Sequence, residues 1–427
     1  MTYTMYNVPR PVLASRHKTL DWVDGAAAVF VVIWVSEAFA RLGLNTFFTV
    51  MVYAYFVPRF YFAARWLFPA VLRIWPMLLY PALCMVSVAW SLVPQISFVA
   101  AIQLWFTLCL GVFLGHRFRL SGLAALIVTG LGLTILLSLV NLTNLWPPAF
   151  GPDGGFQGIY TNKNALGQRC ALVILTGALF FVSQRAAAVR WAWCGWLVCV
   201  AAVLTLTQSI TAIVLCVLAV GGFGLATLRG PAFTGLTIIL CCLVASGLVA
   251  VWSLDIALIE DGLAALGKTS TLTGRTLLWE IAMNRAQDRP LLGVGYMAYW
   301  SAPEFAQDVS IINGLYGATV EAFHNVFLET LVMLGPFGVV SMAALIGFSM
   351  RAIWRAPKGS LRTWALALFA VLIFSAMLGS SLYRPHELTL LMVVALAAAC
   401  AAASEAALPV ARSSETTPRP MPPKVQS

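Results

Sequence analysis

Long apolar runs alternate with short polar segments along almost the whole chain. Most runs approach the roughly 20 residues that a helix needs to cross the hydrocarbon core of a bilayer, where helices satisfy their own backbone hydrogen bonds. The pattern therefore predicts an all-α polytopic membrane protein of about 12 transmembrane helices. We place the spans near residues 20–40, 44–58, 74–92, 98–115, 121–141, 165–184, 191–207, 210–228, 232–252, 324–350, 363–381 and 388–404.

The same pattern divides the chain into five regions. They are a cytoplasmic N-terminal segment over 1–19, transmembrane helices 1–9 over 20–252, a large outward-facing loop over 253–323, transmembrane helices 10–12 over 324–404, and a disordered cytoplasmic tail over 405–427. The tail is rich in Pro, Ser and Thr, a composition typical of disorder. We expect the chemistry in the large loop and in the polar turns that face it.

Composition and charge agree with this class. Apolar residues make up 61% of the chain and charged residues only 10%, where soluble domains carry about a quarter charged residues. The net charge of +10 reflects a bias of Lys and Arg towards the side of the N-terminus, as the positive-inside rule expects of a cytoplasmic face. We therefore expect no nucleic-acid partner. The cations outside that face are Arg41, Lys163, Arg169, Lys268, Arg275, Arg285, Arg289 and Arg384.

The chain offers no pattern for a metal or a cofactor. All nine cysteines fall within predicted spans, which favours neither a disulfide framework nor a zinc site. A DxD motif and clustered carboxylates are also absent from the sequence. We expect a protein without metal or cofactor.

The large loop contains the first candidate, Arg275. Apolar and polar residues alternate over 276–288 with the spacing of a short amphipathic helix on the membrane surface, ended by Pro290. Arg275 would lie in its first turn, where the helix dipole disfavours a cation. A bound diphosphate or a loop carboxylate such as Glu280 would each compensate that charge, and the residues alone do not choose between them.

The loop returns to the membrane through a second group of candidates, Glu321, His324, Asn325 and Glu329. Glu329 would lie about 7 Å deeper than His324 at 1.5 Å per residue, and an ionisable residue at that depth is a functional candidate. An isolated interfacial histidine is more often structural. The polar neighbours of His324 favour a role in binding or catalysis.

Two further outward turns carry polar clusters. Asn162, Lys163 and Asn164 precede a span, so the asparagines are candidates either to cap that helix or to bind an anion at its N-terminus. Lys163 and the nearby Arg169 are equally explained as snorkelling residues. Arg384 either faces the same cavity as Arg275 or anchors its own turn.

Several motifs in this order resemble the O-antigen ligase and polymerase superfamily. They are Thr273-Gly274-Arg275-Thr276 with Leu278-Trp279, then Pro290-Leu291-Leu292-Gly293-Val294-Gly295, then His324-Asn325 opening a span. The segment 158–167 with its Thr-Asn-Lys-Asn core, together with Trp90-Ser91 and Pro94, is closest to the exopolysaccharide polymerase (ExoQ-type) branch. On the residues alone, Trp90 and Pro94 are explained as an interfacial anchor and a turn.

The resemblance implies a multi-span, GT-C-like glycosyltransferase in the bacterial inner membrane, with the loop 253–323 and the active site in the periplasm. Such proteins take a glycan from undecaprenyl diphosphate and transfer it to an acceptor hydroxyl without metal. Arg275 would bind the diphosphate, and His324 would position or deprotonate the acceptor. Lys163, Arg384, Asn162, Asn164 and Asn325 would assist substrate binding, with Glu321 or Glu329 orienting His324.

Three functions remain open from the sequence. The first is polymerisation of lipid-linked oligosaccharide repeats, with a chain-length regulator as a possible partner beside membrane lipids. The second is a ligase that transfers the finished glycan to lipid A core or to a protein. The third is a transporter or flippase of lipid-linked glycan, which is disfavoured because only Glu37 and Glu329 are clearly placed inside the membrane.

Overall fold

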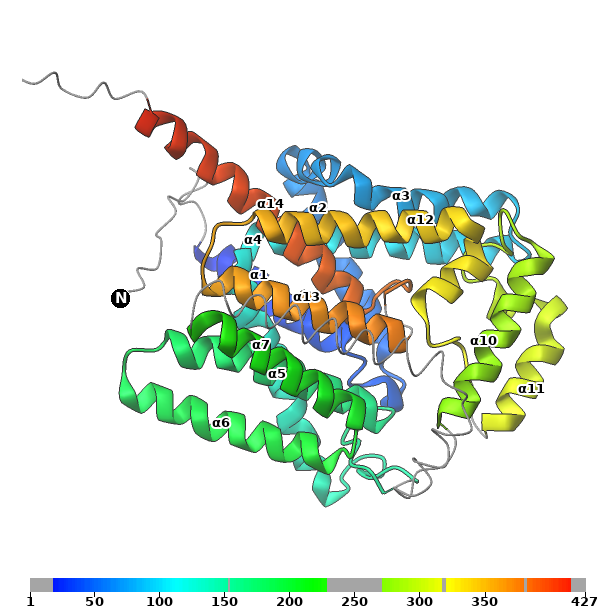
Figure 1. Ribbon diagram of the computed structural model, residues 1–427, viewed down its shortest axis with the longest axis horizontal. Helices are drawn as coiled ribbons and strands as arrows, with labels where there is room; N and C mark the ends of the chain where they lie inside the picture. Colours follow the sequence, from blue (N-terminus) through cyan, green and yellow to red (C-terminus); the bar gives the residue numbers. More distant parts are fainter. Residues whose placement is uncertain (1–17, 153, 229–270, 317–319, 380–381, 416–427) are drawn as a thin grey trace, which may run out of the picture.

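The computed structural model describes residues 18–152, 154–228, 271–316, 320–379 and 382–415 (Figure 1). Regular structure within these ranges is helical, beside one isolated bridge between Phe150 and Phe156. Eight of the described helices are long and apolar enough to cross a membrane. The predicted all-α polytopic membrane protein is therefore confirmed. The predicted span 232–252, the loop residues 253–270, and the terminal residues 1–17 and 416–427 lie outside the described residues. The tail predicted to be disordered from residue 405 is helical as far as Glu415, so that prediction is wrong for 405–415.

Twelve α-helices are described in chain order. They are α1 (Lys18–Val35), α2 (Asn45–Arg73), α3 (Trp75–Val86), α4 (Pro94–Val140), α5 (Lys163–Ser183), α6 (Ala187–Leu206), α7 (Ile210–Leu228), α10 (Thr271–Asp288), α11 (Ala306–Tyr316), α12 (Val326–Arg355), α13 (Ser360–Leu378) and α14 (Leu388–Glu415). Short 3-10 helices are η1 (Ala40–Leu42), η2 (Ser87–Ala89), η3 (Asn141–Thr143), η4 (Tyr299–Ser301) and η5 (Pro303–Phe305).

Some helix boundaries differ from the predicted spans. Helix α2 does not end at residue 58 but continues through Pro58 and Pro69 to Arg73, a total length of 29 residues. The predicted span over 74–92 contains the 12-residue α3 followed by η2, which ends at Ala89. Pro94 begins the next helix, where its fixed φ and missing N–H are tolerated.

Helix α4 contains the two predicted spans 98–115 and 121–141 as one 47-residue element. A straight helix of that length would measure about 70 Å, more than twice the hydrocarbon thickness of about 30 Å. Arg119 interrupts it with a φ of 55° and a ψ of −177°. The break lets the chain turn back, so α4 provides two crossings.

A buried carboxylate ties the first helices together. Asp24 on α1 has no exposed surface and accepts hydrogen bonds from Tyr55 Oη at 2.8 Å and from both Arg59 Nε and NH2 at 2.9 and 2.7 Å. Arg117 Nε donates to it at 3.1 Å. Sequence analysis named Glu37 and Glu329 as the intramembrane charges, and Asp24 is a further buried charge, near the start of α1. Asp24 is paired on several sides, as a buried charge must be.

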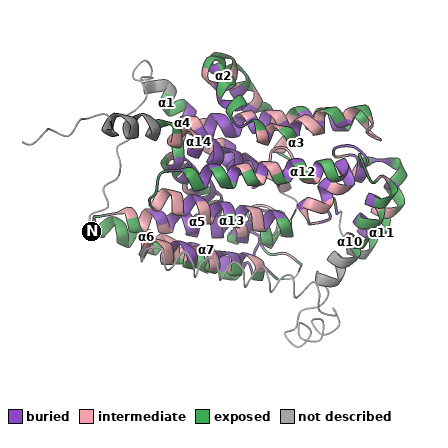
Figure 2. Ribbon diagram, turned by 45° about the horizontal axis from the view of Figure 1, so that its top comes forward, coloured by how far each residue is buried: buried purple, intermediate pink, exposed green. Residues whose placement is uncertain are grey.

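Helix α14 passes through the middle of the bundle and is its most buried element (Figure 2). Residues 390–398 are each at most 1% exposed. On the facing helix α4, a Cβ at Gly111 or Gly115 would collide with Val394 or with the backbone of Ala395. Small residues allow the two helices to approach closely, which is how membrane helices gain packing energy.

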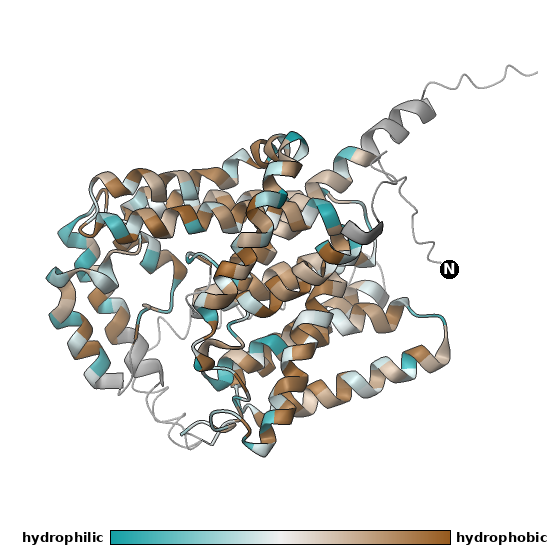
Figure 3. Cartoon of the chain, turned by 180° about the vertical axis from the view of Figure 1, so that it is seen from behind, coloured by the Kyte–Doolittle hydropathy of each residue, from teal (hydrophilic) through white to brown (hydrophobic). Residues whose placement is uncertain are grey.

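A smaller unit lies at one end of the bundle, built from α10, α11, η4 and η5 (Figure 1). It has its own apolar core, which includes Leu278, Ala282 and Ile312. Hydrophilic residues are more frequent here than on the bundle helices (Figure 3). The predicted helix over 276–288 is present, but α10 begins at Thr271. Arg275 consequently lies in the second turn rather than the first.

Candidate functional site

The glycine segment 290–296 docks between two distant parts of the chain. Trp90 Nε1 donates to Leu292 O at 2.9 Å, and the Leu92 amide donates to Val294 O at 3.1 Å. On the other side, the Gly295 amide donates to Met333 O of α12 at 2.8 Å. Trp90 was explained from the sequence as an interfacial anchor, and the structure adds a hydrogen bond to the glycine segment. The motifs around Trp90 and Gly295 form one structural unit.

Glycine is required in this unit by close contact. Gly293 and Gly295 have φ values of 64° and 103°, where residues with a Cβ are strained. A Cβ on Gly295 would lie 2.5 Å from the Ser91 side chain. Helix α12 breaks at Gly335, with a φ of 64°, where the Leu291 carbonyl packs against its Cα. The glycines therefore allow the backbones to interlock.

We expect Gly295→Ala to lower the free energy of unfolding by about 1–3 kcal/mol or more, because overpacking and backbone strain act together. The measurement is the thermal unfolding midpoint of purified protein in detergent. Gly314→Ala is the matched control, since a Cβ there meets nothing within 4 Å. Equal midpoints for the two variants would contradict the interlocked geometry.

His324 lies in a strained turn at the start of α12. Its φ is 55°, in the left-handed region that histidine tolerates more readily than most residues but that still carries strain. Asn325 follows as the helix cap, and its Oδ1 accepts from the amides of Phe327 and Leu328 at 3.0 and 3.3 Å. Asn325 therefore caps α12, and its predicted contact with substrate stays a prediction. His324 is one of seven described non-glycine residues with a positive φ.

Contacts from several directions hold the residue before His324. The Phe323 amide donates to Glu329 Oε1, and the Phe323 carbonyl accepts from Trp279 Nε1 of α10 at 3.0 Å. Glu329 is 1% exposed and also accepts from Trp300 Nε1 at 3.4 Å. Glu329 therefore positions the turn through the Phe323 backbone.

Arg384 reaches the same segment from the turn before α14. Its NH2 donates to the Glu321 carbonyl, and its NH1 lies 3.8 Å from Glu321 Oε2. Its Nε donates to Tyr383 Oη at 2.9 Å, and its charge interacts with the Glu329 carboxylate. Arg384 therefore joins the His324 segment to the turn 382–387.

Arg275 belongs to α10, the helix that contacts this segment, although its side chain lies outside the described residues. It precedes Trp279 by four residues, so the two positions share one face of α10. Trp279 is the residue that donates to Phe323 O. The backbone therefore places Arg275 about one helical turn from the contact that leads to His324.

The cluster at the start of α5 has mainly structural partners. Asn162 caps α5 by accepting from the Ala165 amide at 2.8 Å, and Asn164 Oδ1 accepts from Ser209 Oγ at 2.8 Å. Lys163 packs over Gly155, where a Cβ would collide with its side chain. Asn164 thus contacts the turn 207–209, whereas Asn162 caps its own helix.

Arg169 is buried rather than snorkelling, so that part of the prediction is wrong. It is 8% exposed, its NH2 donates to Ser36 O at 3.2 Å, and its NH1 donates to Gln168 Oε1 at 3.1 Å. The Arg169 and Arg384 charges favour the ionised form of Glu387. Arg169 and Glu387 are 218 positions apart, so no local pattern in the sequence relates them.

Glu387, half-buried at the start of α14, should make stability depend on pH. Burial, and then the Glu37 carboxylate, raise the pKa of Glu387 from 4.5 to about 8, although Arg169 and Arg384 act in the opposite direction. The folded protein therefore holds a proton that the unfolded chain releases, and stability should fall as pH rises from about 4.5 to about 8.

Glu387→Gln should remove this part of the pH dependence and raise the unfolding midpoint relative to the unsubstituted protein at pH 8. Thermal unfolding at several pH values measures it. The exposed Glu280→Gln is the control and should leave the pH profile unchanged. A Glu387→Gln profile that runs parallel to that of the unsubstituted protein would contradict the assignment.

The fold and the site define a multi-pass helical membrane protein that carries a histidine, cations and aromatic residues at one end of its bundle. Comparison with known proteins gives its relatives. Residues 195–343 match a family model described as O-antigen ligase. That range includes Arg275, the glycine segment and His324.

A named relative and a solved structure are also similar. The chain is 28% identical over 268 residues to the exopolysaccharide production protein ExoQ of Rhizobium meliloti, and the match covers 61% of each chain. It therefore spans less than two thirds of that relative. A chain from a structure titled as a peptidoglycan synthase complex that coordinates polymerization and crosslinking shares 15% identity at a TM-score of 0.39, covering 80% of this chain and 97% of that one.

These findings confirm the resemblance to the O-antigen ligase and polymerase superfamily, near ExoQ.

Proposed function

We propose that this protein is an inner-membrane glycosyltransferase that polymerises undecaprenyl-diphosphate-linked oligosaccharide repeats into a surface polysaccharide or exopolysaccharide. It works without metal or cofactor, with its active site in the periplasm. The observation that carries the proposal is the strained turn at His324. Hydrogen bonds from α10, to Glu329 and from Arg384 hold the residues before it in place. The similarity to the exopolysaccharide production protein ExoQ supports polymerisation into a polysaccharide as the proposed reaction.

The proposed reaction is a single displacement at the anomeric carbon. The acceptor hydroxyl oxygen forms a bond to that carbon while its proton passes to the His324 imidazole, a group able to act as a base near neutral pH. The bond from the anomeric carbon to the diphosphate oxygen breaks, and undecaprenyl diphosphate leaves with the electron pair. Atoms and charges balance without an oxidant or a metal ion.

The negative charge that grows on the leaving diphosphate needs fixed cations. Arg275 on α10 and Arg384 beside Glu321 supply them. A hydrogen bond to a charged group contributes about 1.5–3 kcal/mol, and arginine adds a fork that matches phosphate oxygens. Lys163, Asn162 and Asn164 are assigned to more distant parts of the donor, at the start of α5, where Asn162 caps the helix and Asn164 bonds to Ser209.

A ligase is the second candidate function, because the matching family model is described as O-antigen ligase. The bond-breaking step would be the same. The acceptor would be lipid A core or a protein instead of a second lipid-linked glycan. A chain-length regulator would be a partner only of the polymerase.

Reconstitution separates the two candidates. Purified protein in lipid vesicles receives one undecaprenyl-diphosphate-linked repeat and no other acceptor, and products are resolved by size. A ladder of lipid-linked oligomers supports the polymerase. Transfer that appears only after lipid A core or a candidate protein is added supports the ligase. Movement of substrate across the bilayer without product would overturn both.

A further inference from the structure

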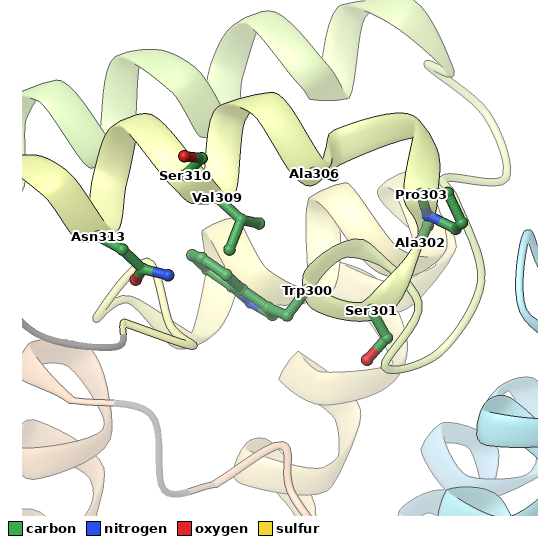
Figure 4. A pocket seen from close by; sticks show the side chains of 8 residues that line it. All are labelled: Trp300, Ser301, Ala302, Pro303, Ala306, Val309, Ser310 and Asn313. Atoms are coloured by element: carbon green, nitrogen blue, oxygen red, sulfur yellow. The ribbon is translucent and has the colours of Figure 1, made fainter.

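A cavity of about 410 Å³ opens beside the site, between α11 and the short helices η4 and η5 (Figure 4). Its volume falls in the range of about 300–1,000 Å³ that small-molecule sites occupy. The lining includes Trp300, Val309, Ser301, Ser310 and Asn313. The function proposed above uses none of these side chains as a ligand.

The chemistry of the lining suits an uncharged, hydroxyl-rich ligand. The Trp300 ring and the Val309 methyl groups form an apolar surface, while serine hydroxyls and an amide supply hydrogen bonds. The Asn313 Oδ1 accepts from the Val320 amide at 2.7 Å, and its amide nitrogen lies on the side of Trp300 (Figure 4). The cavity lining contains no charged side chain among the described residues, so a diphosphate has no counter-charge here. A sugar ring presents both C–H faces and hydroxyl groups, and it matches this surface.

The cavity is coupled to the His324 turn through Trp300. The Trp300 Nε1 donates to Glu329 Oε2 at 3.4 Å, and its ring lies 4.9 Å from the Phe323 ring, centroid to centroid. Phe323 precedes His324 and donates its amide to Glu329. A ligand on Trp300 would therefore lie close to the residues that position His324.

We propose that this cavity is a glycan subsite that binds a non-reacting sugar residue of the substrate, with Trp300 as its stacking platform. The proposal rests on the proposed function and extends it to a substrate-holding site outside the membrane. Binding a remote sugar would hold the growing chain while the lipid diphosphate occupies the cationic region. Binding energy from such remote parts can be used to orient the reacting groups.

Direct binding tests the subsite independently of catalysis. The probe is the free oligosaccharide released by mild acid from the lipid-linked glycans of the producing cells, titrated into the full-length protein in nanodiscs by calorimetry. We expect saturable binding that Trp300→Ala weakens at least about tenfold, because a buried aromatic contact dominates such sites. Trp300→Phe should remain within about threefold, since it keeps a ring but loses the Nε1–H that donates to Glu329.

A second variant guards against misfolding of Trp300→Ala. Val309→Trp fills the cavity from α11 and leaves Trp300 and Glu329 intact, so it should also weaken binding at least about tenfold. Ile311→Trp is the matched control, because Ile311 lies on the same helix, is 51% exposed and does not line the cavity. It should bind like the unsubstituted protein.

The outcomes separate the two proposals. Absence of saturable binding, or native affinity in both Trp300→Ala and Val309→Trp, would overturn the subsite even if the protein polymerises lipid-linked repeats. Binding with the expected variant pattern supports the subsite. If the same preparations then make no product from lipid-linked donor, the glycosyltransferase proposal fails while the sugar site stands.

Discussion

Replacing His324 by alanine should lower the rate of glycosyl transfer by roughly 10²- to 10⁴-fold, the contribution typical of a general base. The acceptor hydroxyl would then lose the imidazole that takes its proton in the proposed reaction. The measurement is the single-turnover rate of product formation in vesicles at saturating donor. Saturation matters because the loss should appear in the chemical step, with donor binding little changed.

The strain at His324 supplies a sharper test than the alanine variant alone. Glycine adopts a φ of 55° without the steric cost that histidine carries. His324→Gly should therefore unfold at a higher temperature than His324→Ala, in which a Cβ still carries the strain, and yet be equally inactive. His116→Gln is the control, since His116 lies on α4, where its Nδ1 contacts Val112 O. Full activity in His324→Gly would rule out catalysis by this residue.

Arg275→Ala is expected to have the second largest effect, a loss of roughly 10²- to 10³-fold in the transfer rate. Removing one fixed donor from a charge-stabilising site has this size of effect. Arg275→Lys should recover part of the rate, because lysine keeps the charge but loses the two-pronged geometry that matches phosphate. The measurement is kcat/KM for the lipid-linked donor.

The control for Arg275 is Glu280→Gln on the same helix, an exposed residue with no role in the proposed site. It should transfer glycan at the unsubstituted rate. Higher salt should weaken donor binding by the unsubstituted protein more than by Arg275→Ala, because salt screens exposed charges. Unchanged kcat/KM in normally inserted Arg275→Ala would remove Arg275 from the diphosphate site.

Local patterns predicted the helical membrane architecture well. Apolar run length alone identified the class, and the amphipathic spacing over 276–288 found α10. Boundaries were less accurate. Helix α2 runs past Pro58 because membrane helices tolerate proline. The start of α10 at Thr271 was missed because the prediction followed the amphipathic spacing, which does not extend into its first turn.

The sequence could not assign partners to the polar candidates. From the sequence, the N-terminal cluster of α5 and the turn around Arg384 were equally good candidates for substrate binding. In the structure, Arg384 donates a hydrogen bond to the Glu321 carbonyl near His324, while Asn162 caps a helix. Trp300 was overlooked, because a single tryptophan in a loop gives no periodic signal. Its importance depends on contacts with Glu329 and Phe323.

What the chain determines by itself is therefore its membrane class, most of its helices and the residue types available for chemistry. These follow from interactions between near neighbours and from the length of apolar runs. The tertiary structure decides which of those residues meet. The Trp90 segment pairs with the glycine segment across about 200 residues, and the Arg384 turn meets the Glu321 carbonyl across 63. Contacts of that range depend on how the helices pack, because no local periodicity records which helix lies beside which.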